Sequence, residues 1–263
     1  MIPVPLHAGN PGLMTGDGNW TWFIPGQVPT LIDAGVGQPA HVDAIVEAAA
    51  GAPLQVLVTH GHSDHASGAA AIAARLPGSR FLKMPWTDVD ATRGVPWEPI
   101  GDGDVFSAGD VTLTAVHTPG HATDHLCFWS EAARALFGGD LAIATTTVWI
   151  PSREGAVAAY LASLERVLAL RPARIYPAHG PVIDDPAALL TKYLAHRRRR
   201  DAQILDALRR GPATVPVLVS TIYREVPDVL TKRAIETVTA HLLKLQHDGL
   251  VDRDGEAWHI IEP

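Results

Sequence analysis

The chain has 263 residues, of which 47% are hydrophobic and 19% charged, a composition typical of a folded globular protein. The formal net charge of −7 excludes a globally basic surface for nucleic acid, so any such binding must be local. The single cysteine, Cys127, excludes an internal disulfide and a cysteine zinc cluster, and its apolar surroundings predict a small core residue.

The N-terminal residues 1–7 contain neither a basic segment nor a long apolar core, and no apolar run of the sequence is long enough to span a bilayer. We therefore expect a cytoplasmic protein without a signal peptide, a transit peptide or a membrane-inserted segment. The length suffices for a large core domain and a small second one.

Two short strands are predicted first, at 20–24 and 29–33, with a turn at Pro25-Gly26 between them. Asp33 ends the second strand. A turn former and a carboxylate that supports metal ligands are equally good interpretations of it. Residues 39–51 carry apolar side chains at helical spacing and predict a helix.

The segment with the most potential metal ligands lies between a predicted buried strand, 54–58, and an alanine-rich helix from about 66 to 76. Within six residues it carries three imidazoles and a carboxylate, which are good ligands for a divalent metal such as zinc. A polar turn with a helix cap is the alternative, but a cap would explain only one of these residues. The candidate ligands are His60, His62, Asp64 and His65.

A strand at 80–84 leads into residues 85–103, which show no periodicity and predict a long loop of the kind that is usually functional or mobile. Its Trp86 and Trp97 could line a substrate groove or pack as anchors, and we slightly favour anchors.

The later strands repeat one pattern, in which a short apolar strand ends in His or Asp beside Gly. The strand 111–118 precedes His121, the strands 126–129 and 135–137 precede Asp140, and a helix at 156–169 and a strand at 174–176 precede His179. Together with the first segment these residues make seven candidate ligands, enough for two ions with Asp140 between them and a bridging water. A sheet with its site along one edge fits this pattern.

The motifs His-x-His-x-Asp-His, Thr-Pro-Gly-His, Gly-Gly-Asp and Pro-Ala-His-Gly, in this order over roughly residues 15–185, resemble the metallo-β-lactamase superfamily. The resemblance implies a four-layer αββα sandwich of the α+β class, with metals at one sheet edge. It also implies that His60, His62 and His121 bind the first metal, that Asp64, His65 and His179 bind the second, and that Asp140 bridges them. True β-lactamases of this fold usually lack the Asp140 ligand and are exported, so we expect at most weak β-lactamase side activity.

The C-terminal part predicts a helix at 186–210, two helices at about 214–224 and 231–247, and a hairpin of 250–252 and 257–260 turned at Asp254-Gly255. This order is similar to a winged helix. With it, nearly the whole chain resembles the β-lactamase-like protein two family, whose characterised members are zinc-dependent endoribonucleases on single-stranded RNA. The predicted domains are a catalytic domain at 1–185, a connecting helix at 186–210 and a winged-helix-like domain at 211–263.

The expected function is that of a binuclear-zinc hydrolase, with Mn²⁺ or Fe²⁺ as other possible ions, that cleaves single-stranded RNA through a metal-bridging hydroxide. Asp64 would orient the nucleophile, and His125 would protonate the leaving group or brace a ligand. A histidine at a strand start that makes only a local hydrogen bond is at least as good an interpretation of His125. The alternative is an acyl hydrolase on a small thioester, ester or lactone, in the manner of glyoxalase II. A non-enzymatic binding protein with a structural metal is the third hypothesis, and a homodimer is compatible with each of them. The arginine run 197–200 could bind RNA or form one solvated helix face.

Overall fold

The structure is a computed structural model that describes residues 2–152, 157–223 and 228–261. It divides into two compact units, of which the first comprises residues 1–118, 124–148 and 167–189, and the second comprises residues 119–123, 149–166 and 190–263. No helix among the described residues is both long and apolar enough to cross a membrane.

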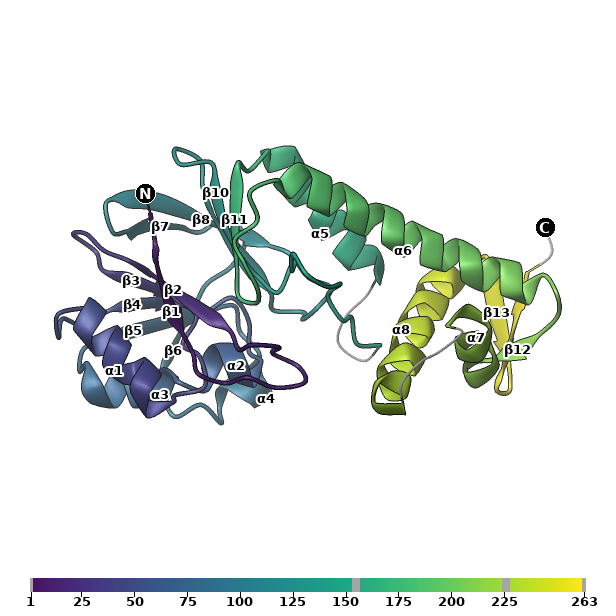
Figure 1. The fold of residues 1–263 in the computed structure, drawn as a ribbon, viewed down its shortest axis with the longest axis horizontal. Coiled ribbons are helices and arrows are strands. Elements are labelled where there is room, and N and C mark those ends of the chain that lie inside the picture. The colour runs from purple at the N-terminus through teal and green to yellow at the C-terminus, as the bar shows by residue number, and fades with distance from the viewer. Residues whose placement is uncertain (1, 153–156, 224–227, 262–263) are drawn as a thin grey trace. The chain divides into compact units, whose positions relative to one another are not determined.

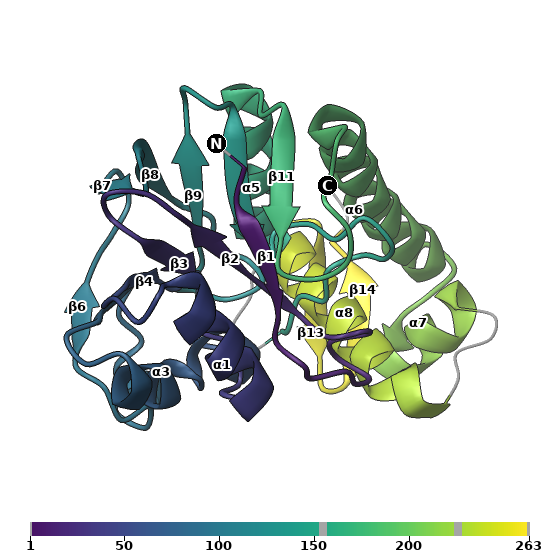
Figure 2. The same cartoon turned by 60° about the vertical axis from the view of Figure 1, so that its left-hand side comes forward.

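The first unit contains a mixed six-stranded sheet in the order β1-β2-β3-β4-β5-β6. The strands β1, β2 and β3 pair antiparallel, and β3 to β6 pair parallel. The helices α1 and α3 lie against one face of this sheet (Figures 1 and 2). The bounds are β1 Val4–His7, β2 Trp20–Ile24, β3 Thr30–Ile32, β4 Gln55–Leu57, β5 Arg80–Lys83, β6 Trp97–Pro99, α1 Pro39–Ala48 and α3 Ala69–Arg75.

The second sheet is also mixed, with the order β11-β10-β9-β8-β7 and one parallel pair, β10 with β11. Alternate apolar residues of the two sheets form one shared core, which includes Leu57, Leu113 and Phe128. The predicted metallo-β-lactamase sandwich is therefore confirmed. The bounds are β7 Val105–Ala108, β8 Val111–His117, β9 Leu126–Ser130, β10 Ala135–Gly139 and β11 Arg174–Pro177.

The helix predicted at about 66–76 is instead two short helices, α2 Ser63–Ala66 and α3, and this part of the prediction was wrong. The break falls at Gly68, whose backbone approaches residues 34–37 so closely that a Cβ there would lie 2.1 Å from the carbonyl oxygen of Ala34. The Gly68 N–H donates to the carbonyl of Gly35 (2.9 Å). Alanine-rich helical propensity is thus overridden by tertiary contact.

The predicted loop 85–103 contains a short helix, α4 Thr87–Asp90, and the edge strand β6, so the expectation of an irregular loop was also wrong. The Asp90 carboxylate accepts a hydrogen bond from the backbone N–H of Trp86 (2.7 Å) at the start of α4. Trp97 packs edge-on against Phe81 at 6.0 Å between ring centroids, which confirms its interpretation as an anchor.

Within the second unit the chain forms a helical module with a short three-stranded sheet, β12-β14-β13. Its core gathers Ile204, Leu218, Leu242 and Trp258, and the predicted hairpin is present. The first residue of the helix predicted at 156–169 lies outside the described residues. The last residue of the helix predicted at 214–224 also lies outside them. The bounds are α5 Val157–Leu170, α6 Pro186–Leu208, α7 Val215–Ile222, α8 Asp228–His247, β12 Ala213–Thr214, β13 Val251–Asp254 and β14 Ala257–Ile260.

Candidate metal centre

The polar residues of the site follow the carboxyl ends of strands that run in the same direction. Strands β3 and β4 are parallel, so Asp33 and the histidine segment after β4 leave the first sheet at one edge. Strands β10 and β11 are parallel, so Asp140 and His179 leave the second sheet at one edge. A hydrogen bond from Leu126 N–H to the Thr59 carbonyl (2.8 Å) joins the two edges.

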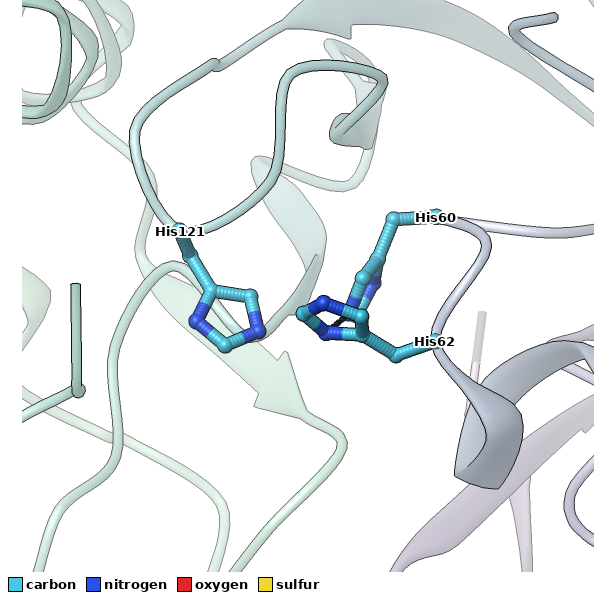
Figure 3. Close-up of side chains that lie close together, drawn as sticks. All are labelled: His60, His62 and His121. Atoms are coloured by element: carbon cyan, nitrogen blue, oxygen red, sulfur yellow. Dashed lines mark hydrogen bonds between the residues drawn. The ribbon is translucent and has the colours of Figure 1, made fainter. Parts of the chain in front are cut away.

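Three of the predicted ligands form a histidine cluster. Figure 3 shows the rings of His60, His62 and His121 directed toward one another. One ring nitrogen of each lies within 4.8 Å of the others. His60 Nε2 and His62 Nδ1 are 2.9 Å apart. His121 Nδ1 lies 2.9 Å from the carbonyl oxygen of Trp149, which leaves Nε2 as its ligand atom. These three residues are therefore close enough to share one ion, and their assignment to the first metal stays a prediction.

The remaining four predicted ligands surround a second point. His65 Nε2 lies 3.5 Å from one oxygen of Asp64 and 3.5 Å from one oxygen of Asp140. His179 Nε2 lies 3.3 Å from the same two oxygens. Asp140 therefore lies beside both histidines. The possible ligand atoms of His60, His65 and Asp140 also lie within 4.8 Å of one another.

His65 shows that these residues fit a bound cation. Its Nδ1 lies 2.8 Å from Asp33 Oδ2, so Nδ1 carries the proton and donates it to that carboxylate. Its buried Nε2 has no hydrogen-bond partner among the described residues, although it faces two carboxylate oxygens. Because a lone pair that faces two acceptors is satisfied only by a positive charge, this arrangement calls for a proton or a metal ion.

The pKa values describe the same electrostatic field. Burial lowers the pKa of His65, but Asp64, Asp33 and Asp140 outweigh it and raise the pKa well above its ordinary value. Burial raises the pKa of Asp64, but His65 and His179 outweigh it and lower the pKa to about 2. Three clustered carboxylates thus favour positive charge at this point, which a divalent ion would supply.

The comparisons with known proteins agree with this geometry. The family model described as the metallo-beta-lactamase superfamily matches residues 14–179. The chain belongs to the metallo-beta-lactamase superfamily. The model described as the beta-lactamase associated winged helix domain matches residues 214–258.

Two curated relatives extend over nearly the whole chain. An "Atrochrysone carboxyl ACP thioesterase" of Aspergillus chevalieri is 35% identical over 94% of this chain and 82% of its own length. A "Beta-lactamase-like protein 2 homolog" of Drosophila melanogaster is 31% identical over 91% of this chain and 86% of its own, which confirms the predicted relationship. A beta-lactamase domain protein from Burkholderia ambifaria shares the fold, with a TM-score of 0.84 and 20% identity over 98% of this chain and 91% of that one.

In this member of the superfamily, Asp33 has both of the roles that the sequence left open. Its φ of 65° is a left-handed conformation that asparagine and aspartate adopt more readily than other side chains. Its Oδ1 accepts a hydrogen bond from the Thr59 N–H (2.7 Å), and its Oδ2 holds His65. It therefore turns the chain and also fixes the tautomer of a candidate metal ligand.

His125 is fully buried, and both of its ring nitrogens are engaged. Its Nε2 accepts a hydrogen bond from the backbone N–H of Asp140 (3.0 Å), so Nδ1 carries the proton and donates it to Thr118 Oγ1 (2.8 Å). The geometry favours a brace on Asp140 over the predicted proton donor.

A buried charge cluster that sequence reasoning missed supports the histidine segment. Lys83 Nζ is 1% exposed and lies 2.7 Å from Asp90 and 3.2 Å from Asp124. Asp124 Oδ2 accepts a hydrogen bond from the Gly61 N–H (2.8 Å), while Arg93 Nη2 donates to the Gly61 carbonyl (2.8 Å). A lysine at the end of a predicted strand was the only sequence signal, and the charge partners are distant along the chain.

Proposed function

We propose that this chain is a metal-dependent hydrolase of acyl thioesters. The observation that carries the proposal is the similarity to the relative named an ACP thioesterase, which extends over 94% of this chain. Two further relatives with thioesterase names are each 32% identical over at least 92% of the chain. These names favour the acyl-hydrolase alternative over the cleavage of RNA.

The arginine run of α6 supports this choice, because Arg197, Arg198 and Arg200 have contacts within the second unit. Arg197 is 3% exposed and lies over the Tyr160 ring at 5.4 Å, and Arg200 lies over the Tyr223 ring at 4.1 Å. Arg198 pairs with Glu165 at 2.8 Å. With Arg197 buried and Arg200 held against Tyr223, the run does not present four adjacent free charges to a phosphate backbone.

The leaving group gives a second, chemical argument. A thiol has a pKa of about 8.5, so it can leave as a thiolate without receiving a proton from an acid. An alkoxide leaving group, as in RNA cleavage, benefits from a proton donor. Because His125 is buried with both ring nitrogens engaged, it is poorly placed to donate a proton. A site without this donor suits a thioester better than a phosphodiester.

We infer that His60, His62, His121, Asp64, His65, His179 and Asp140 hold two divalent ions. Nitrogen and carboxylate donors suit zinc, manganese and iron, and zinc is our proposal. When bound, such ions would polarise the thioester carbonyl and activate a water molecule. Asp64 and Asp140 would orient that water by accepting its hydrogen bonds, and Asp33 and His125 would hold the ligands in place.

The experiment compares hydrolysis of a benzoyl thioester of N-acetylcysteamine with cleavage of a labelled single-stranded RNA by zinc-loaded protein. Thioester hydrolysis that falls at least a hundredfold in Asp64→Ala is the expected result. Asp43→Ala, on an exposed surface pair with Arg75, is the control. RNA cleavage with an inert thioester would overturn the proposal.

A further inference from the structure

A pocket of about 410 Å³ lies in the first unit and reaches His179, one of the candidate metal ligands. Its walls are the turn after β1, the start of β2, residues 143–146 and residues 179–181. This volume is within the range of roughly 300–1,000 Å³ that holds small organic ligands. A group bound here would therefore lie next to the metal centre.

One wall is a preformed apolar projection. Residues Gly12 and Gly16 exchange both backbone hydrogen bonds (2.8 and 2.9 Å), which closes a tight turn. The turn exposes 65% of Leu13 and 56% of Met14, and Met14 lines the pocket. Because Thr15 Oγ1 donates to the Asn10 carbonyl (2.6 Å), the turn is held in this form before any ligand binds.

The opposite end of this wall is aromatic and also braced. The rings of His7 and Trp20 meet edge to face at 4.8 Å between centroids. The His7 Nδ1 accepts a hydrogen bond from the Gly9 N–H (3.2 Å), so Nε2 donates to the Asp17 carbonyl (2.9 Å). A Cβ at Gly18 would lie 2.8 Å from the His7 ring, so glycine is needed for this packing.

The charged residues of the pocket lining favour apolar ligand groups over anionic ones. None of the described residues that line the pocket is a lysine or an arginine, and Asp17 contributes a carboxylate. A phosphate or carboxylate group would meet no lysine or arginine among these residues, and Asp17 carries a like charge. Met14, Trp20 and Ile143 instead offer contact to an apolar or aromatic group.

We propose that this pocket binds the acyl group of the thioester and selects uncharged aromatic or bulky apolar acyl groups over acidic ones. The proposal rests on the thioesterase function proposed above and names its substrate class. The pocket takes the acyl side of the scissile carbonyl, so the thiol side points away from it.

The test measures kcat/KM for acetyl, benzoyl and succinyl thioesters of N-acetylcysteamine with the zinc-loaded full chain. Thr145→Trp places an indole at an exposed lining position, and we expect the benzoyl-to-acetyl ratio to fall at least tenfold. The matched control is Thr147→Trp, an exposed residue two positions along the same loop that does not line the pocket. Its ratio should remain that of the unmodified chain.

A second variant tests the charge. Asp17→Lys is expected to raise the succinyl-to-acetyl ratio at least threefold, whereas the same charge change at the exposed Glu47 on α1 should not. Ratios unaltered by both Thr145→Trp and Asp17→Lys in an active thioesterase would overturn the acyl-pocket proposal alone. Absence of hydrolysis of all three thioesters would instead overturn the proposed function.

Discussion

Asp124 Oδ2 accepts a 2.8 Å hydrogen bond from the backbone N–H of Gly61, the residue between the candidate ligands His60 and His62. The peptide that carries both histidines is therefore held by a carboxylate on one side and by Arg93 on the other. A Cβ at Gly61 would lie 2.8 Å from the Trp86 ring, so the segment is also confined sterically.

The first prediction follows from this bond. Asp124→Ala should weaken metal binding by about 10- to 100-fold, because the His60–His62 peptide loses its fixed orientation. Asp124→Asn keeps an oxygen acceptor and should lose less. Competition with a chelator measures the affinity below the unfolding temperature. Equal metal affinity in Asp124→Ala and the unmodified chain would show that the bond is only structural.

The second prediction concerns Lys83. Lys83→Met leaves Asp90 and Asp124 as buried carboxylates without their cation, and should cost about 3–5 kcal/mol of unfolding free energy. Adding Asp124→Asn removes one of the two stranded charges, so the double variant should lose less than the sum of the single losses. Denaturant unfolding of the four proteins gives the coupling. Simple additivity would mean that the two groups do not interact.

The third prediction tests whether His125 braces Asp140 or donates a proton, and it begins with Thr118, the hydrogen-bond partner of His125. Thr118→Val removes the acceptor of the Nδ1 proton and should reduce kcat several-fold, since an unsatisfied buried donor costs about 1–3 kcal/mol. A brace predicts that His125→Gln lowers kcat at every pH without altering the shape of the pH profile. Loss of the basic limb of the profile in His125→Gln would restore the proton-donor role.

The fourth prediction concerns pH and His41, which is 2% exposed and lies with Nε2 2.8 Å from Thr21 Oγ1. Burial and, to a smaller extent, His7 lower its pKa from 6.5 to about 4. Between these values the unfolded chain binds more protons than the folded one, so stability falls as the pH falls.

Acidification from pH 7.5 to 4.5 should therefore cost about 2–3 kcal/mol through His41 alone. His41→Gln removes this contribution, and the difference in unfolding free energy between the two proteins should shrink by that amount at pH 4.5. Denaturant titrations at both pH values measure it. A pH-independent difference would contradict the lowered pKa.

Many elements of this protein could be predicted from short stretches of its sequence. Short apolar runs ending in His or Asp predicted β3, β4, β8, β10 and β11, and the spacing of the motifs predicted the seven candidate ligands that the fold brings into clusters. The elements of the C-terminal part were also predicted from local signals, namely helical periodicity and the Asp254-Gly255 turn. Such signals depend on period and turn chemistry within a few residues.

The missed features depend on residues that are distant in the chain. The strand β1 Val4–His7 was not predicted, and it pairs at the edge of the sheet, where its Pro5 is tolerated. The interruption at Gly68 follows from an approach to Ala34, and β6 from pairing with β5. These are non-local contacts, which local propensity does not predict.

The sequence by itself determined the family, the metal-binding chemistry and the candidate ligands, because the ligands are fixed residue types at fixed distances from strand ends. Only the tertiary structure decided that His125 is buried with its Nε2 on the backbone of Asp140, and that Lys83, Asp124 and Gly61 interact. It also formed the pocket, whose lining contains no lysine or arginine among the described residues, from turns far apart in the chain. Burial and charge pairing arise from packing, and packing is what the linear order of residues does not state.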